Sequence, residues 1–377
     1  MQSNLKTAIV HEWLVNYAGS ERVVESFTNI WKEADVFTLV DFLNQQERNT
    51  IVKGKIPKTS FIQKLPFAEK HHRSYLPLFP LAIEQFDLSD YNVILSSAHA
   101  VSKGVITSSQ QLHISYCHTP MRYAWDFTHQ YLKESNLQKG IKAAIVKLFL
   151  HYLRIWDYTT ANRVDYFIAN SKYIAKRIKK IYNKDAEVIY PPVDTKLFPC
   201  EINKENYYVT ASRFVPYKRI DLIVEAFAKM PDKKLLVIGE GPEKEKIYSK
   251  AKANIEFLGY QEGAELKKYM QKAKAFIFAA EEDFGIIVVE ALACGTPVIA
   301  LRKGGTAETI VHLQNGIHFN EQTSDAIINA VNEFEKNEQH FDSLSISAAA
   351  AQFERSIFEK KILEFVTQRA ETFFNQL

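Results

Sequence analysis

The sequence predicts an α/β protein of two domains, each a parallel β-sheet with helices on its faces. The chain has 377 residues, which is too long for one ordinary core, so two domains of roughly 150–200 residues are expected. Short β-prone runs alternate with helix-like segments, which is typical of doubly wound parallel sheets. This alternation pauses at the proline-rich segment 188–199 and then restarts, which indicates a domain boundary there.

The first half contains five predicted strands: Thr7–His11, Val36–Val40, Val93–Ser97, Leu112–His118 and Tyr166–Asn170. A loop of small residues at positions 16–21 follows the first strand, and Arg22–Trp31 then has helical spacing. Gly19 in this loop lets a ligand approach the backbone closely, although a single glycine also suits a simple turn.

Two segments of the first half do not fit the alternation of short β-prone runs with helix-like segments. Residues 53–86 are rich in Lys, Pro, His and aromatic residues, which predicts an irregular, partly helical excursion of the kind that often holds a variable substrate. Residues 139–156 have helical spacing, with basic residues set among Ile, Leu, Phe and Trp. That helix fits either a core element with a basic exposed edge or an element in contact with a membrane surface.

His118 ends the fourth predicted strand and precedes a Thr-Pro turn. Ligands of parallel sheets bind at the carboxyl ends of the strands, so this position favours a ligand contact. A hydrogen-bonded structural histidine is the alternative.

The second half restarts the pattern with predicted strands at Tyr207–Ser212, Lys234–Gly239, Ile255–Leu258, Ala275–Ala280 and Pro297–Leu301. Arg213 and Lys218 lie in the loop after the first of these strands. Arginine can bind a diphosphate through its forked N–H groups and lysine can bind it as a point charge, whereas each residue taken alone also suits a solvated surface.

The stretch 275–300 reads as strand, acidic loop, helix, turn and strand. Glu282 lies at the carboxyl end of its first strand, and Glu290 lies in the second turn of the helix predicted at Ile286–Cys294. Backbone N–H groups around Gly285, Ile286 and Ile287 would point at an anion together with the helix dipole. Two carboxylates beside an anion site suit a ligand that carries both hydroxyl and phosphate groups.

Composition excludes several classes of protein and indicates a charged partner. The three cysteines, Cys117, Cys200 and Cys294, show no CxxC spacing, which argues against a disulfide framework or zinc knuckle and fits a reducing cytoplasm. The N-terminus lacks a signal-peptide pattern, and no apolar run is long enough to span a membrane.

Residues 1–193 hold 24 Lys and Arg against 17 Asp and Glu, while the remainder holds 23 Lys and Arg against 27 Asp and Glu. A basic first half favours an anionic partner, either acidic lipid headgroups or a phosphate-bearing substrate, although a plain solvated surface also explains it.

These residues together resemble glycosyltransferase family 4. The resemblance is carried by the Glu282/Glu290 pair in EDFGIIVVEALACGTPVIA, by Arg213 and Lys218, and by the HTP at His118. It implies the GT-B fold, with two Rossmann-like domains facing across a cleft. Residues 1–193 would bind the acceptor, with the returning helix 357–377 added to them, and residues 194–356 would bind the nucleotide sugar.

The resemblance also implies roles for the site residues. Arg213 and Lys218 would bind the donor diphosphate and stabilise it as the leaving group without a metal, and the chain contains no Asp-x-Asp. Glu282 and His118 would bind the transferred sugar, and Glu290 would bind the ribose diol. The backbone at Phe284, Gly285, Ile286 and Ile287 would contact sugar and phosphates, and Gly19 would let the first loop approach the phosphate.

The same resemblance implies a retaining, metal-independent enzyme without a cofactor other than its nucleotide-sugar co-substrate. Sub-patterns such as YCHTPMRYAWD and IYPPVD resemble bacterial mannosyltransferases of surface-polysaccharide assembly, including that of lipopolysaccharide. GDP-mannose is therefore the preferred donor and a saccharide or lipid-linked saccharide the acceptor, with a UDP-sugar donor as the alternative. A hydrolysing nucleotide-sugar epimerase and a non-catalytic sugar-nucleotide-binding protein are the rival functions. A cytoplasmic protein is expected, with peripheral contact to the inner face of an anionic membrane and no nucleic-acid partner.

Overall fold

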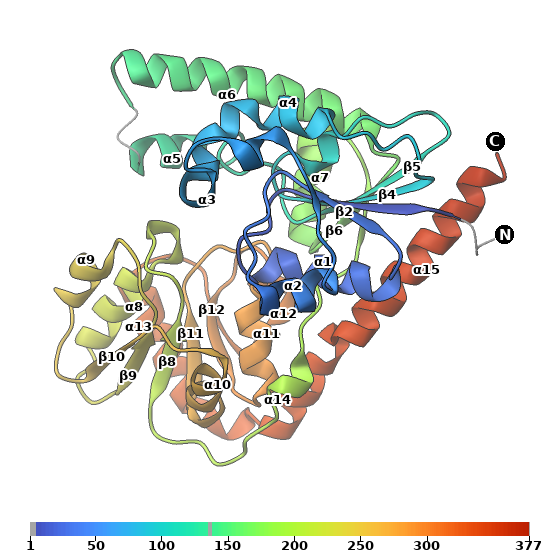
Figure 1. The fold of residues 1–377 in the computed structure, drawn as a ribbon. Coiled ribbons are helices and arrows are strands. Elements are labelled where there is room, and N and C mark those ends of the chain that lie inside the picture. Colours follow the sequence, from blue (N-terminus) through green and yellow to red (C-terminus); the bar gives the residue numbers. More distant parts are fainter. Residues whose placement is uncertain (1–4, 135–137, 377) are drawn as a thin grey trace. The chain divides into compact units, whose positions relative to one another are not determined.

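The structure is a computed structural model that describes residues 5–134 and 138–376. The chain divides into two compact units, Met1–Pro192 with Phe358–Leu377, and Val193–Ile357. Each unit is built on its own parallel sheet (Figure 1).

The first unit contains a seven-stranded sheet in the order β3-β2-β1-β4-β5-β6-β7, and all its neighbouring strands are parallel. Its strands are β1 (Thr7–His11), β2 (Asp35–Thr38), β3 (Lys58–Thr59), β4 (Val93–Ala98), β5 (Leu112–Cys117), β6 (Tyr166–Ala169) and β7 (Ala186–Val188). The central strands β1, β4 and β5 are buried along their whole length, as expected for a parallel sheet covered on both faces.

Helices cover both faces of this sheet. They are α1 (Gly19–Ile30), α2 (Gln45–Val52), α3 (Ala68–His71), α4 (Phe79–Glu84), α5 (Thr128–Glu134), α6 (Ile141–Thr160), α7 (Lys172–Tyr182) and α15 (Arg355–Phe374). On one face α1 and α15 share a core, in which the rings of Phe27 and Phe358 stack with centroids 6.5 Å apart. On the other face α4 and α6 pack against β1 and β4.

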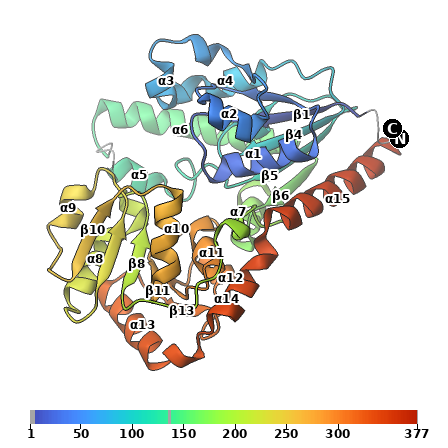
Figure 2. The same cartoon turned by 60° about the horizontal axis from the view of Figure 1, so that its bottom comes forward.

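The second unit contains a six-stranded sheet, again parallel throughout, in the order β10-β9-β8-β11-β12-β13. Its strands are β8 (Tyr208–Ala211), β9 (Leu235–Ile238), β10 (Ile255–Gly259), β11 (Ala275–Phe278), β12 (Val298–Leu301) and β13 (Gly316–Phe319). The helices of this unit are α8 (Ile220–Ala228), α9 (Lys244–Tyr248), α10 (Gly263–Lys272), α11 (Ile286–Ala293), α12 (Thr306–Thr309), α13 (Ser324–Lys336) and α14 (Ser343–Ala350). Helices α8 and α13 pack together on one face, and α10 and α11 lie on the other (Figure 2).

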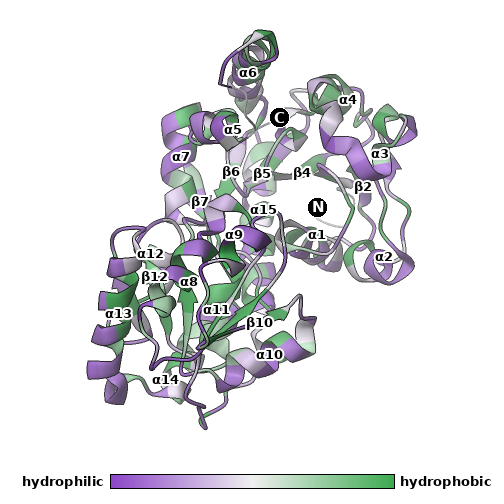
Figure 3. Ribbon diagram, turned by 90° about the vertical axis from the view of Figure 1, so that its left-hand side faces the viewer, coloured by the Kyte–Doolittle hydropathy of each residue, from purple (hydrophilic) through white to green (hydrophobic). Residues whose placement is uncertain are grey.

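The sequence pattern and the structure agree on the fold class. Apolar strands are sandwiched between helices that are apolar on the inner side and polar on the outer side, as the alternating colours of α13 illustrate (Figure 3). The predicted ranges leave out β3, β7 and β13. The first two are edge strands of two and three residues, and β13 is interrupted by a histidine, so none gives a clear apolar run.

Candidate functional site

Both sheets reverse their strand order beside their first strand. In the second unit β8 has β9 on one side and β11 on the other, and in the first unit β1 has β2 and β4 as its neighbours. Ligands of open α/β sheets bind outside the carboxyl ends of the strands at such a reversal. The predicted residues Arg213 and Glu282 follow the two strands at the reversal of the second sheet.

Lys218 and Glu282 form an ion pair in the second unit. The Lys218 Nζ donates to Glu282 Oε1, and both side chains are less than one-fifth exposed. The same ammonium lies 5.4 Å from the centre of the Tyr217 ring and 5.9 Å from that of Phe278, distances at which cation–π attraction acts. A half-buried lysine held in this way can bind a second anion with little reorganisation.

Arg213 lies at the end of β8 and its side chain is exposed. Two backbone hydrogen bonds fix the loop that follows to the segment between β9 and α9: the Phe214 N–H donates to Glu240 O, and the Glu243 N–H donates to Phe214 O. Arg213 and Lys218 therefore both lie on a short loop that is fixed to the body of the sheet, and this loop follows the carboxyl end of β8.

The loop between β11 and α11 has the geometry of an anion site. Gly285 is the N-cap of α11 and has φ +85 and ψ 65, a left-handed conformation that suits glycine. The Ile286 and Ile287 N–H groups belong to the first turn of the helix, where N–H groups have no intrahelical acceptor. The Phe284 side chain, by contrast, is buried and packs on Phe353 with ring centroids 5.5 Å apart, so only its backbone can face a ligand.

Gly304 and Gly305 form part of this site and are absent from the prediction. Gly304 pairs with the backbone of Glu282, and the Gly305 N–H donates to Glu282 O over 2.8 Å. A Cβ on Gly304 would lie 2.0 Å from Glu282 O, and a Cβ on Gly305 would lie 2.3 Å from Phe284 Cα. These two glycines let the loop after β12 support the loop that carries Glu282.

We expect Gly304→Ala to destabilise the protein by at least about 1–2 kcal/mol, the usual cost of a left-handed non-glycine residue. Its φ is +71, and the added methyl would also collide with the Glu282 carbonyl. Urea unfolding measures the loss. Gly263→Ala is the matched control, because nothing lies within 4 Å of a Cβ at Gly263; equal unfolding free energies for the two variants would contradict the packing described for Gly304.

Glu290 lies in the second turn of α11, as the sequence predicts, and is only 5% exposed. Its position on the inner side of the helix gives it a fixed orientation, in contrast to the exposed Arg213. A carboxylate of this kind can accept two hydrogen bonds from neighbouring hydroxyl groups.

The reversal point of the first sheet carries a polar cluster of His11, Glu12, Ser97, His99 and His118, in which the first three are buried and the last two are partly exposed. His118 Nε2 lies 2.9 Å from Ser97 Oγ, and His11 Nδ1 lies 3.1 Å from the same oxygen. Glu12 Oε1 accepts the backbone N–H groups of His99 and of two nearby residues, and Glu12 Oε2 lies 3.1 Å from His99 Nδ1. His118 is therefore hydrogen-bonded within a network, as the alternative of a structural histidine predicts.

Glu21 connects this cluster to the start of α1. Its carboxylate accepts the Ala18 N–H and the Ser20 hydroxyl, and it lies 3.4 Å from His11 Nε2. Gly19, which the sequence placed in a loop, is the first residue of α1. The small residues around it form the helix start that Glu21 caps.

The cluster shifts the pKa of His118 and that of His11 in opposite directions. Burial lowers the pKa of His118 to about 3, and the neighbouring His99 and His11 rings add to the effect. Burial also opposes a charge on His11, but the hydrogen bond to Glu21 and the charges of Glu21 and Glu12 outweigh it and raise the pKa of His11. His118 is thus a neutral ring near pH 7, able to donate or accept one hydrogen bond to a hydroxyl group.

Acid should destabilise the protein through His113 and His118. Burial lowers the pKa of the His113 ring to about 4, so the unfolded chain takes up protons below about pH 6.5 while the folded chain does not. The stability contributed by each neutral ring is complete above pH 6.5 and falls as the pH drops towards its folded pKa.

Lowering the pH from 6.5 to 5 reduces the free energy of unfolding of the unmodified protein. We expect the reduction to be smaller in His113→Asn, by up to about 2 kcal/mol, and His118→Asn should behave in the same way. Urea unfolding at both pH values gives the comparison. His11 has the opposite sign, since its raised pKa favours folding at low pH, so it cannot produce the expected trend. Identical pH dependence in all three proteins would contradict the assignment.

Two family models match successive parts of the chain. The model described as Glycosyltransferase Family 4 matches residues 18–197, and that described as Glycosyl transferases group 1 matches residues 195–351. Among curated proteins, an uncharacterised glycosyltransferase of Methanocaldococcus jannaschii is 30% identical over 187 residues, covering 47% of this chain and 51% of the relative.

A GDP-mannose-dependent alpha-(1-6)-phosphatidylinositol monomannoside mannosyltransferase of Mycolicibacterium smegmatis is 28% identical over 201 residues, covering 45% of this chain and 53% of the relative. The matches to these two curated relatives thus span about half the length of each. Among solved structures, HepE of Anabaena in complex with UDP has a TM-score of 0.70 and 17% identity, covering 97% of this chain and 100% of HepE. The expectation of the GT-B fold is confirmed by this likeness.

Within residues 5–134 and 138–376, no three His, Cys, Asp or Glu side chains are grouped so that they could hold a metal ion. No helix in the described parts of the chain has the length and apolar character needed to cross a membrane.

Proposed function

We propose that this chain, a protein of the family 4 type with the GT-B fold, is a glycosyltransferase that moves a sugar from a nucleotide sugar to a saccharide or lipid-linked saccharide. The observation that carries the proposal is the Lys218–Glu282 pair at the reversal point of the second sheet, beside the first turn of α11. A cation, a carboxylate and helix N–H groups at one strand end match the phosphate and hydroxyl groups of a sugar nucleotide.

In the proposed reaction Lys218 and Arg213 bind the donor diphosphate. The bond between the anomeric carbon and the diphosphate oxygen breaks, and the two cations stabilise the negative charge that develops on that oxygen. The N–H groups of Ile286 and Ile287 bind the phosphate from the helix end. These groups are part of the fold before the donor arrives, so little reorganisation is needed.

Glu282 and Glu290 take different parts of the donor. Glu282 accepts hydrogen bonds from the transferred sugar, and Glu290, fixed in the second turn of α11, accepts them from the ribose diol. His118 contacts the sugar as a neutral ring, in keeping with its low pKa. Gly19 at the start of α1 would let the donor phosphate lie close to the backbone of that loop.

The proposed stereochemical course is retention. The acceptor oxygen attacks the face from which the diphosphate departs, and a diphosphate oxygen takes the acceptor proton. Glu282 is paired with Lys218 and binds hydroxyl groups in this scheme, so it does not serve as a covalent nucleophile. The protein cations carry the leaving-group charge, and no metal ion is required.

GDP-mannose is the proposed donor, and the proposed setting is the synthesis of a bacterial surface polysaccharide. The mycolicibacterial relative, whose name specifies GDP-mannose, supports this choice. HepE, solved with UDP, supports the alternative of a UDP-sugar donor. A non-catalytic sugar-nucleotide-binding protein is the second alternative; it would bind the same donor without transferring its sugar.

Calorimetric titration with GDP and UDP tests the donor site. We expect GDP to bind more tightly than UDP and Lys218→Gln to weaken GDP binding at least about tenfold, as expected for a lost charged contact. Tighter binding of UDP would select the UDP-sugar alternative. If neither nucleotide bound the unmodified protein, the proposed donor site would be wrong.

A further inference from the structure

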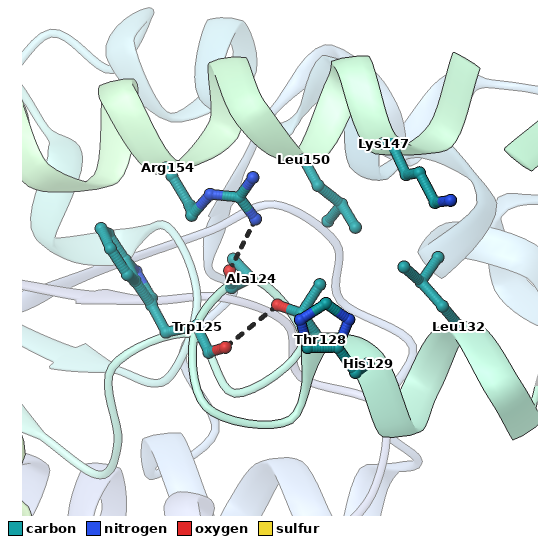
Figure 4. Close-up of a pocket in the computed structure, with 8 residues that line it drawn as sticks. All are labelled: Ala124, Trp125, Thr128, His129, Leu132, Lys147, Leu150 and Arg154. Carbon is teal, nitrogen blue, oxygen red and sulfur yellow. Dashed lines mark hydrogen bonds between the residues drawn. The ribbon is translucent and has the colours of Figure 1, made fainter. Parts of the chain in front are cut away.

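A pocket lies between α5 and α6 of the first unit (Figure 4). Its cavity volume is about 480 Å³, within the usual range for ligand pockets. Lys147, Leu150 and Arg154 line it from α6, and His129 and Leu132 line it from α5. The pocket therefore has room for a small organic ligand between two helices of one compact unit.

The pocket lies on the carboxyl side of the first sheet. Asp157 of α6 pairs with Lys103, which follows β4, and accepts the indole N–H of Trp125, which follows β5. Because α6 leads back to the start of β6, the residues before Asp157 lie further out on the carboxyl side. Ligands of open α/β sheets bind outside this edge, and His118 lies at the same edge.

The polar groups of the pocket are suited to an anion. His129, Lys147 and Arg154 carry or can carry positive charge, and none of the described residues that line the pocket is acidic. Arg154 donates one N–H to Ala124 O over 2.9 Å, which holds the guanidinium at the pocket wall and leaves further N–H groups for a ligand. Lys147 donates to Gln138 O over 3.1 Å and also has donors left.

Two acids close to the pocket residues in the sequence are paired with other cations. Asp157 lies three residues after Arg154, but it forms its ion pair with Lys103. Asp126 follows the pocket residue Trp125 and forms an ion pair with Arg177 of α7. These pairs occupy the two acids, so the Arg154 guanidinium keeps its charge for a ligand.

The remaining wall of the pocket is apolar. Leu132 and Leu150 are each 7% exposed, and the Trp125 ring lines the pocket while its indole N–H donates to Asp157. A sugar ring presents C–H groups on its faces, so it can pack on such a wall while an acidic substituent reaches Arg154. Inorganic phosphate would use the cations alone and leave the apolar wall in water.

The pocket is within reach of His118 along a fixed loop. Ala124 at the pocket wall is six residues after His118, and a chain of that length spans at most about 22 Å. Arg177 donates to Thr119 Oγ1 over 2.7 Å and pairs with Asp126, so both ends of the loop are attached to α7. A saccharide of a few units can therefore extend from the edge that carries His118 to the pocket.

We propose that the α5–α6 pocket binds an acidic group, phosphate or carboxylate, of the saccharide acceptor, with Arg154 and Lys147 on the acid and Trp125 against the adjoining sugar ring. This inference rests on the proposed glycosyltransferase function and narrows its acceptor to an acidic saccharide. Arg154 determines the specificity, because its planar fork can donate two parallel N–H groups to either kind of oxyanion.

Ligand-detected NMR on the full chain tests binding without transfer, with glucose 1-phosphate, glucuronate, glucose and inorganic phosphate as probes. We expect at least one of the two acidic sugars to bind about tenfold or more tightly than glucose, and the tighter of the two identifies the acid. Arg154→Gln should remove this preference, whereas Arg154→Lys should keep part of it because the charge remains. Equal binding of glucose and both acidic sugars, or binding of inorganic phosphate as tight as that of the sugars, would overturn the proposal.

Two matched controls separate the pocket from diffuse charge and from the donor site. Lys179→Gln with Lys180→Gln removes two exposed charges of α7 in the same unit and should bind like the unmodified chain. Lys218→Gln should also keep the preference for acidic sugars, because the pocket belongs to the other unit. An equal loss in the α7 control would assign the binding to diffuse charge. Loss in Lys218→Gln but not in Arg154→Gln would show that the probes occupy the donor site. Either result would overturn the proposal.

Transfer assays distinguish failure of this inference from failure of the proposed function. The acceptors are a disaccharide that ends in glucuronate or glucose phosphate and the same disaccharide that ends in glucose. We expect Arg154→Gln to raise the KM for the acidic acceptor at least about tenfold and to leave kcat and the KM for the donor unchanged. Equal kcat/KM for acidic and neutral acceptors would overturn the pocket assignment and leave the glycosyltransferase intact. Arg154-dependent binding without transfer to any acceptor would contradict the proposed function and the acceptor role of the pocket together.

Discussion

Lys218→Gln should lower the turnover at saturating donor by at least about 100-fold, the usual effect of losing one charge from a preorganised site. The glutamine keeps the length and polarity of the side chain but cannot neutralise the charge that forms on the leaving diphosphate. The variant also leaves the Glu282 carboxylate, which is 17% exposed, without its lysine partner. Repulsion between that carboxylate and the donor phosphate would reduce donor affinity as well. Initial rates of nucleoside diphosphate release give kcat and KM.

Two companion variants show whether the charge or the fold is responsible. Lys234→Gln removes an exposed lysine of the same unit that pairs with Glu256, and it should leave kcat within about twofold because surface pairs contribute little. Glu282→Gln should restore part of the donor affinity of Lys218→Gln, because it removes a negative charge close to the donor phosphate. A Lys218→Gln enzyme with unchanged kcat and a normal melting temperature would show that the diphosphate site has been misplaced.

Lys103→Met should destabilise the first unit by about 3–5 kcal/mol, the range found when one partner of a buried ion pair is removed. Lys103 is 1% exposed, and its Nζ lies 2.8 Å from Asp157 Oδ1 and 3.0 Å from Thr160 Oγ1. Asp157 also accepts hydrogen bonds from the Trp125 indole and the Tyr182 hydroxyl. Methionine fills the space but leaves the buried carboxylate uncompensated.

Urea unfolding of the variant measures this loss. Lys103→Met combined with Asp157→Asn should recover a large part of it, because asparagine can keep accepting from Trp125 and Tyr182 without a charge. Lys234→Gln again serves as the control and should change the unfolding free energy by less than about 1 kcal/mol. A Lys103→Met protein with the stability of the unmodified chain would mean that the network does not fix α6 to the sheet.

The fold class could be predicted because its signals are local and repeated. Runs such as Val93–Ser97 and Ala275–Ala280 are apolar, short and separated by helical segments, and both lie in buried central strands. The last helix was expected to return to the first domain, and Phe358 and Ile362 lie in the core of the first unit. Edge strands show no comparable apolar run in the sequence. The strand Lys58–Thr59, for example, consists of two exposed residues and is recognised only by its pairing with β2.

Part of the candidate site could be predicted because strand ends can be read from the sequence. Lys218 was expected at the donor diphosphate and Glu282 at the transferred sugar, and the structure brings these two residues into contact within one unit. The supporting groups could not be predicted in the same way. Gly304 follows a different strand, and Glu12 and His99 are joined by pairing between β1 and β4. Their proximity depends on the register of distant segments, which a single sequence does not state.

The helix predicted at residues 139–156 illustrates the same limit. Its spacing left both a core helix with a basic edge and a membrane-facing helix open, and α6 combines a buried side with an uncovered apolar face. Arg154, which the pattern placed with the other basic residues, points into the pocket beside α5. The sequence shows which residues share a face, but the neighbours of that face come from the rest of the fold.

Transfer itself is the most direct test of the proposed function. The full chain, treated with EDTA, would be incubated with GDP-mannose and a panel of UDP-sugars in the presence of saccharide and lipid-linked saccharide acceptors, and the products identified by mass spectrometry. The account predicts a glycosylated acceptor and one equivalent of GDP from GDP-mannose, at a rate that added Mg²⁺ does not change. Donor binding without transfer from any nucleotide sugar, or transfer that appears only when Mg²⁺ is restored, would contradict it.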